Sequence, residues 1–131
     1  MKWLNRTLIT SPYCYALCLS ESEFTRELRR LKIPPAKQPA FIGNGISSGS
    51  NATTHFFEKN KGNNLSAVVC LGDTKKIPIE SILALLTHES VHIWQAIRDE
   101  IGETKPSHEF EAYAIQQIAQ NLMQSYRKQK K

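Results

Sequence analysis

The segment that decides the fold is residues 88–92, which read His88-Glu89-Ser90-Val91-His92. Each residue advances a helix by about 100°, so positions four apart lie within about 40° of each other on one face. On a helix, the imidazoles of His88 and His92 would therefore project together and could bind one metal ion. Glu89 lies one step round the helix, where its carboxylate can take a proton from a metal-bound water.

The sequence around this motif predicts the helix that the spacing requires. Residues 79–101 contain neither glycine nor proline. Pro78 suits the first turn of a helix, and Gly102 suits its C-terminal end. We therefore predict a helix over about 78–101.

A second helix is predicted after a connection of five residues, beginning at Ser107 and running to about 128. Apolar side chains recur along one face of this segment, as in an amphipathic helix. They are Ala112, Ile115, Ala119, Leu122 and Tyr126. Because the connection is short, the two helices are expected to form an antiparallel pair.

The first part of the chain predicts a strand, a helix and a loop. Residues 13–19 are apolar and aromatic, which favours a strand. Ser20 and Glu23 form a capping box, so a helix is predicted to begin there and to end before Pro34. Residues 34–52 are rich in proline, glycine, serine and asparagine, a composition typical of a surface loop.

A β-hairpin is predicted between this loop and the long helices. Residues 53–58 and 65–71 are two strand candidates, and the residues between them are polar turn formers. A chain of 131 residues has room for one hydrophobic core. We therefore predict a single α+β domain over residues 1–131, in which a small sheet packs against the helix pair.

The net charge of +5 is concentrated at the C-terminus, because residues 127–131 carry four positive charges and no negative one. A short basic terminus usually frays into solvent. Residues 127–131 are accordingly predicted to be a frayed tail, and nucleic acid is not the expected partner.

The cysteines and the apolar runs indicate the compartment. Cys14, Cys18 and Cys70 cannot all pair within one chain, and they are expected to be buried thiols. The N-terminus lacks the pattern of a signal peptide, and the apolar runs are too short to span a membrane. The expectation is a soluble protein of a reducing compartment, the cytoplasm.

Two histidines leave a metal site incomplete, so a third ligand is expected from the second helix. Glu109 and Glu111 follow His92 by seventeen and nineteen residues. Two imidazoles, one carboxylate and an open position suit zinc, with one ion per chain. A purely structural explanation of either glutamate is that negative charge is favourable near a helix N-terminus.

The run from Thr87 to Gln95, with glutamates on the next helix, resembles the gluzincin branch of zinc metallopeptidases over about residues 79–126. The resemblance implies a zincin-like fold and hydrolysis of a peptide or protein substrate by a zinc-activated water, with Glu89 as general base. A metzincin would have glycine at position 95 and histidine at 98, where this chain has Gln95 and Arg98. Residues 87–95 and 106–116 also resemble small proteins encoded by bacteriophages, and this resemblance implies the cytoplasm of a bacterial or phage-infected host cell.

The resemblance fits either glutamate as the third ligand. Glu109 matches a ligand glutamate with an alanine three residues later, whereas residues 111–114 match an aminopeptidase-like arrangement of Glu, small, aromatic and Ala. We prefer Glu109 and keep Glu111 as the alternative. The aspartate that many gluzincins place four residues after the ligand is absent, so Glu111 is also a candidate to orient the histidines.

Other residues have weaker assignments. Tyr113 and His108 are candidates to donate a hydrogen bond to a developing oxyanion, as a tyrosine or histidine does in related peptidases. By analogy with zincins, an extended substrate would lie along the strand 53–58. Three further residues are expected to have structural roles only, by packing or on a strand surface: Trp94, Gln95 and His55.

Two other classes of function compete with the peptidase. The first is a non-catalytic zinc-binding module acting in phage assembly or host interaction, which the small size of the chain favours. The second is a nucleic-acid binder that uses the basic C-terminus, for which affinity would fall steeply with salt.

Overall fold

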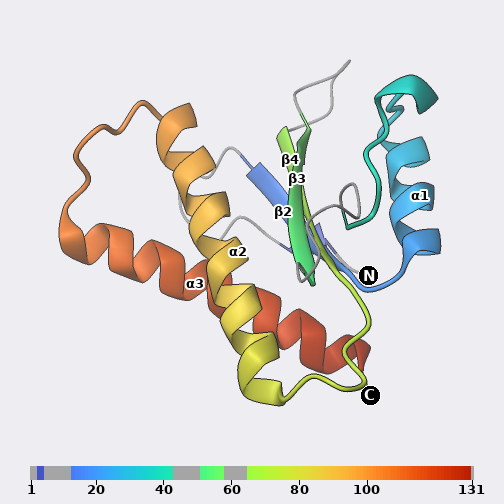
Figure 1. Ribbon diagram of the computed structural model, residues 1–131. Helices are drawn as coiled ribbons and strands as arrows, with labels where there is room; N and C mark the ends of the chain where they lie inside the picture. The colour runs from blue at the N-terminus through green and yellow to red at the C-terminus, as the bar shows by residue number, and fades with distance from the viewer. Residues whose placement is uncertain (1–2, 5–12, 43–50, 58–64, 131) are drawn as a thin grey trace.

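The computed structural model describes residues 3–4, 13–42, 51–57 and 65–130. These residues form a four-stranded sheet with α1 on one face and the helices α2 and α3 on the other (Figure 1). The structure is therefore α+β with a small sheet and a helix pair, as the sequence predicts.

The sheet has the strand order β1-β2-β4-β3 among the described residues. Its strands are β1 (Trp3–Leu4), β2 (Tyr13–Cys18), β3 (Ala52–Phe57) and β4 (Leu65–Leu71). β4 pairs with β2 in parallel and with β3 in antiparallel orientation, so the predicted pairing of residues 53–58 with 65–71 is confirmed. β3 lies at one edge of this sheet.

Helix α1 (Glu21–Arg30) begins at the predicted capping box. The backbone N–H of Glu23 donates to Ser20 Oγ over 3.3 Å. Phe24 and Leu28 are the buried residues of this helix, and they pack on the sheet with Cys18, Val68 and Cys70. His55 reaches this layer from β3, where its ring stacks on Phe24 at 5.2 Å and its Nε2 lies 3.1 Å from the carbonyl oxygen of Phe41. It is a half-buried packing residue rather than a surface residue.

The predicted loop 34–52 contains a short 3-10 turn, Pro35–Lys37, and its last residue belongs to β3. Residues 43–50 of the loop lie outside the described residues, as do residues 58–64 between β3 and β4.

Helices α2 (Ile79–Glu100) and α3 (His108–Gln129) have nearly the predicted bounds. α2 ends where Gly102 adopts a φ of 73°, a left-handed conformation that glycine takes without a Cβ clash. Apolar side chains of both helices pack with the sheet in one cluster, which includes Leu17, Leu71, Leu86, Ile93, Trp94, Ile97, Ile118 and Leu122. Burying each such side chain contributes about 1.5–3 kcal/mol to the free energy of folding, so this cluster fixes the position of α2 against the sheet.

The basic C-terminus differs from the prediction of a frayed tail. Arg127 and Lys128 lie in the last turn of α3. Gln129 donates from its Nε2 to the carbonyl oxygen of Leu17 in β2 over 2.9 Å. The tail prediction is therefore wrong for residues 127–129, because a side chain of the last turn anchors it to the sheet; residue 131 lies outside the described residues.

The cysteines lie in the sheet, and none of the three, all within the described residues, forms a disulfide. Cys18 and Cys70 are fully buried, as predicted, and face each other in the register of β2 and β4, whereas Cys14 is only partly buried. Burial raises the pKa of the Cys18 thiol to about 11 and also raises that of Cys70. Among the described residues, no helix has the length and apolar character needed to cross a bilayer.

Candidate metal centre

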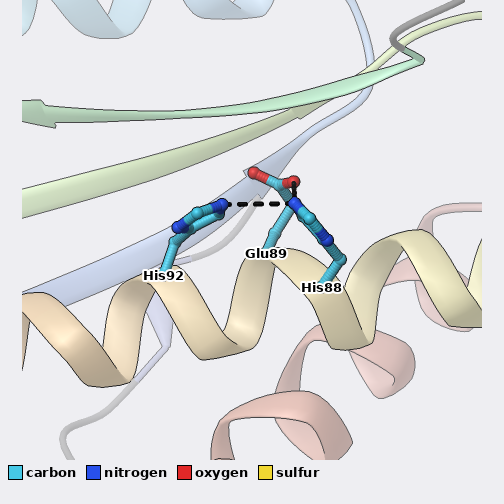
Figure 2. A group of neighbouring side chains, drawn as sticks. All are labelled: His88, Glu89 and His92. Carbon is cyan, nitrogen blue, oxygen red and sulfur yellow. Dashed lines mark hydrogen bonds and ion pairs between the residues drawn. The ribbon is translucent and has the colours of Figure 1, made fainter.

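His88, Glu89 and His92 project from the side of α2 that faces the strands (Figure 2). Their burial differs sharply. The His88 side chain is 67% exposed and His92 is exposed, whereas Glu89 is only 5% exposed. The two imidazoles thus stand at the rim of the space between helix and sheet, and the carboxylate stands inside it.

The imidazole nitrogens have the separation that a shared metal ion requires. His88 Nε2 and His92 Nε2 are 3.2 Å apart, and the rings are inclined by 75°. Two nitrogens bound at about 2.0–2.1 Å to a tetrahedral zinc would lie about 3.3 Å apart. The same separation suits an N–H···N hydrogen bond between neutral imidazoles, so the distance is compatible with a metal but does not require one.

The three side chains form a compact potential ligand set. One ligand atom from each of His88, Glu89 and His92 lies within 4.8 Å of the others. Among the described residues, no other group of three or more histidine, cysteine and acidic side chains meets this criterion. The residues present therefore fit a small divalent cation, with imidazole as the main donor.

The two carboxylate oxygens of Glu89 have different surroundings. Thr54 Oγ1 in β3 donates a hydrogen bond of 2.7 Å to Oε1. Oε2 lies 3.9 Å from His88 Nε2, too far for a direct hydrogen bond. A buried carboxylate needs polar partners, and here one oxygen has its partner in the sheet while the other faces the imidazoles.

A cavity of about 410 Å³ adjoins this group. It lies between the start of β3 and the first half of α2, and its lining is largely apolar. The lining residues are Asn51, Ala52, Ile77, Ser81, Ala84, Leu85, His88 and Glu89. An open hollow that reaches both an imidazole and the buried carboxylate can admit part of a substrate.

The glutamates of α3 are not brought into the group. Glu111 Oε2 accepts a hydrogen bond of 2.8 Å from Trp94 Nε1 and lies 3.9 Å from Arg98. Glu109 is exposed in the first turn of α3. In Figure 2, α3 crosses below α2, on the side away from the three labelled side chains. Neither carboxylate belongs to the compact set, and Glu111 contacts Trp94 and Arg98 rather than a histidine.

The remaining predicted residues also lie outside the compact set. Tyr113 is 64% exposed, and His108 is exposed at the start of α3. Trp94 packs in the core as expected. Gln95 is exposed, so the prediction that it packs is wrong; it lies next to Trp94 in sequence but on a different face of the helix.

Comparison of the chain with protein-family models, with curated proteins and with solved structures gave no match. The resemblance to gluzincins therefore depends on the motif residues alone. Any inference about function therefore depends on the geometry of His88, Glu89 and His92 on α2.

Sequence reasoning missed Thr54. The signal was present, because alternation along β3 places Thr54 on the same face as Ala52 and Phe56, opposite to His55. A hydroxyl on the face of the strand directed toward the motif helix was available as a partner for Glu89.

Proposed function

We propose that the protein is a zinc-dependent peptidase in which His88 and His92 hold the metal and Glu89 is the general base. The observation that carries the proposal is the position of Glu89, whose buried carboxylate has one oxygen fixed by Thr54 and the other directed toward two imidazoles at metal-ligand spacing. A charged group is costly to bury, so a carboxylate kept inside and directed at such a pair favours a chemical role.

Zinc, when bound, would lower the pKa of a coordinated water and polarise the carbonyl of the scissile bond. The chain would supply the proton transfers. Glu89 would take a proton from the water as the water oxygen attacks the carbonyl carbon. It would then give that proton to the amine nitrogen as the C–N bond breaks, which leaves a carboxylic acid and an amine.

Glu109 remains our proposed third protein ligand. The Glu109 side chain is exposed, whereas that of Glu111 is engaged by Trp94 and Arg98. Because the hydrogen bond between Trp94 and Glu111 holds the first turn of α3 on another face of α2, Glu109 would reach the histidines only after that bond breaks and the turn moves. Tyr113 and His108, which are in the first two turns of the same helix, would be carried along with it as oxyanion donors.

The substrate would lie extended along β3. This strand is at an edge of the described sheet and passes over the motif, where Thr54 contacts Glu89. A peptide can add to a sheet by forming main-chain hydrogen bonds along an edge strand. The adjoining cavity would receive one side chain of the peptide next to the scissile bond.

A second candidate function is a non-catalytic metal-binding module, in which Glu89 is a ligand together with His88 and His92. The observation in its favour is that the compact set contains Glu89 and, among the described residues, no further acidic side chain. In that case the metal would stabilise the fold or an interface, and no water would be activated.

A digestion experiment tests the peptidase proposal. Zinc-loaded protein is incubated with a broad library of peptides and the products are identified by mass spectrometry. We expect cleavage that a chelator abolishes and that added zinc restores. Failure to cleave any member of the library by protein shown to contain zinc would favour the non-catalytic module.

A further inference from the structure

We propose that Thr54 is the positioning residue of the site: its hydroxyl holds the Glu89 carboxylate so that one oxygen stays directed toward the histidine pair. This inference rests on the proposed function, in which that oxygen accepts the proton of the attacking water. It concerns a residue outside the motif, on a different element and 35 positions away in sequence.

The first argument is that the two carboxylate oxygens of Glu89 have different surroundings. The 2.7 Å hydrogen bond from Thr54 Oγ1 engages Oε1 of Glu89 alone, and Oε2 is left 3.9 Å from His88 Nε2. A glutamate side chain has three rotatable bonds, and fixing one oxygen removes most of its rotational freedom. Hydrogen bonds to a charged acceptor are about twice as strong as neutral ones, so the bond is strong enough to select one orientation.

The second argument is that Thr54 is itself held rigidly. It lies in the middle of β3, where it pairs with the fully buried Val69 of β4. Its β-branched side chain has few χ1 rotamers. A donor on a paired strand with a stiff side chain is better placed to orient a catalytic group than a donor on a loop.

The third argument links substrate binding to the base. Thr54 shares its face of β3 with Ala52, which lines the cavity that also reaches Glu89. The strand proposed to receive the substrate backbone is thus the strand that fixes the general base. A substrate aligned on β3 would be aligned with Glu89 by the same element.

The test compares three variants of the full chain. Thr54→Val removes the hydroxyl and keeps the shape, and Thr54→Ser keeps a hydroxyl. Thr25→Val makes the same chemical change in α1, the helix that packs on the other face of the sheet. For Thr54→Val we expect kcat to fall about 10- to 100-fold with zinc content and KM nearly unchanged. Thr54→Ser should retain most of kcat, and Thr25→Val should behave like the wild type.

A readout that does not need activity completes the test. Crystal structures of the zinc-loaded wild type and the two Thr54 variants should show the Glu89 carboxylate facing the histidines in the wild type and Thr54→Ser, and turned away in Thr54→Val. An unmoved Glu89 in Thr54→Val, a wild-type kcat in that variant, or an equal loss in Thr54→Ser would overturn the proposal. If the wild type cleaves nothing, the peptidase proposal fails, while the structures still decide whether Thr54 positions Glu89.

Discussion

The indole of Trp94 donates a hydrogen bond of 2.8 Å to the carboxylate of Glu111, and this bond joins the C-terminal half of α2 to the start of α3. Trp94 is 1% exposed, and its ring also lies 5.6 Å from that of Phe110. The contact holds the first turn of α3 against a face of α2 that is different from the face of the histidines. It therefore assigns Glu111 a structural role and separates it from the proposed ligand Glu109.

This separation predicts different effects for two matched substitutions. Glu109→Gln should weaken zinc affinity by at least about 10- to 100-fold, because it replaces a metal ligand. Glu111→Gln should leave zinc affinity unchanged. It should lower the free energy of unfolding by only about 1 kcal/mol, because the amide oxygen can still accept from Trp94 while the negative charge near Arg98 is lost. Zinc titration in competition with a chelator measures the first effect, and urea unfolding measures the second. Loss of zinc in Glu111→Gln alone would reverse the assignment.

Purified protein should contain about one zinc per chain after reconstitution. His88→Ala or His92→Ala should empty the site, because each removes one of the two nitrogens that lie 3.2 Å apart. Elemental analysis after gel filtration provides the measurement, with His55→Ala as the control on the other face of the sheet. Metal retained in both motif variants would place the ion elsewhere on the chain.

The elements of the fold could be predicted from the sequence because their signals are local. The capping box at Ser20 and the glycine at 102 each act within one turn of a helix, and the run between Pro78 and Gly102 contains no residue that breaks a helix. The arrangement of the sheet could not be predicted in the same way. Parallel pairing of β2 with β4 joins segments about fifty residues apart, and no local pattern encodes such a pairing.

The same contrast between local signals and tertiary contacts applies to the site. The spacing of His88 and His92 was sufficient to predict that they converge, because both lie on one helix. The contact between Thr54 and Glu89, and the side of α2 on which α3 packs, depend on tertiary packing. The anchoring of the last turn of α3 by Gln129 is a further contact of this kind, and the charge of that segment gave no sign of it.

The cavity beside His88 should admit part of the substrate. Ala84 is an exposed residue that lines it, so Ala84→Trp should fill the space without disturbing the core. We expect kcat/KM for a cleaved peptide to fall at least about tenfold, equivalent to about 1.4 kcal/mol of transition-state binding, with zinc content unchanged. Gln116→Trp, at an exposed position of α3, is the control. Equal kinetics in the two variants would show that the cavity is not used.

The cysteines should differ in reactivity. The raised pKa of Cys18, about 11, means that its thiol stays protonated at pH 8, and burial protects both Cys18 and Cys70. Iodoacetamide at pH 8 should modify Cys14 first and the other two only after unfolding in guanidinium chloride. Peptide mapping by mass spectrometry reads the order of modification. Rapid modification of Cys18 in the folded protein would contradict the buried position of β2.

The central claim is that Glu89 acts on water rather than on the metal, and comparison of zinc-loaded wild type with Glu89→Gln tests it most directly. The amide oxygen can still accept from Thr54, so the variant should fold and keep zinc, but it has no basic oxygen for the proton. We predict equal zinc content in the two proteins and loss of at least about 99% of kcat in the variant, in line with the 10²- to 10⁴-fold contribution of general-base catalysis. Equal cleavage by both proteins, or loss of zinc from Glu89→Gln, would contradict the account.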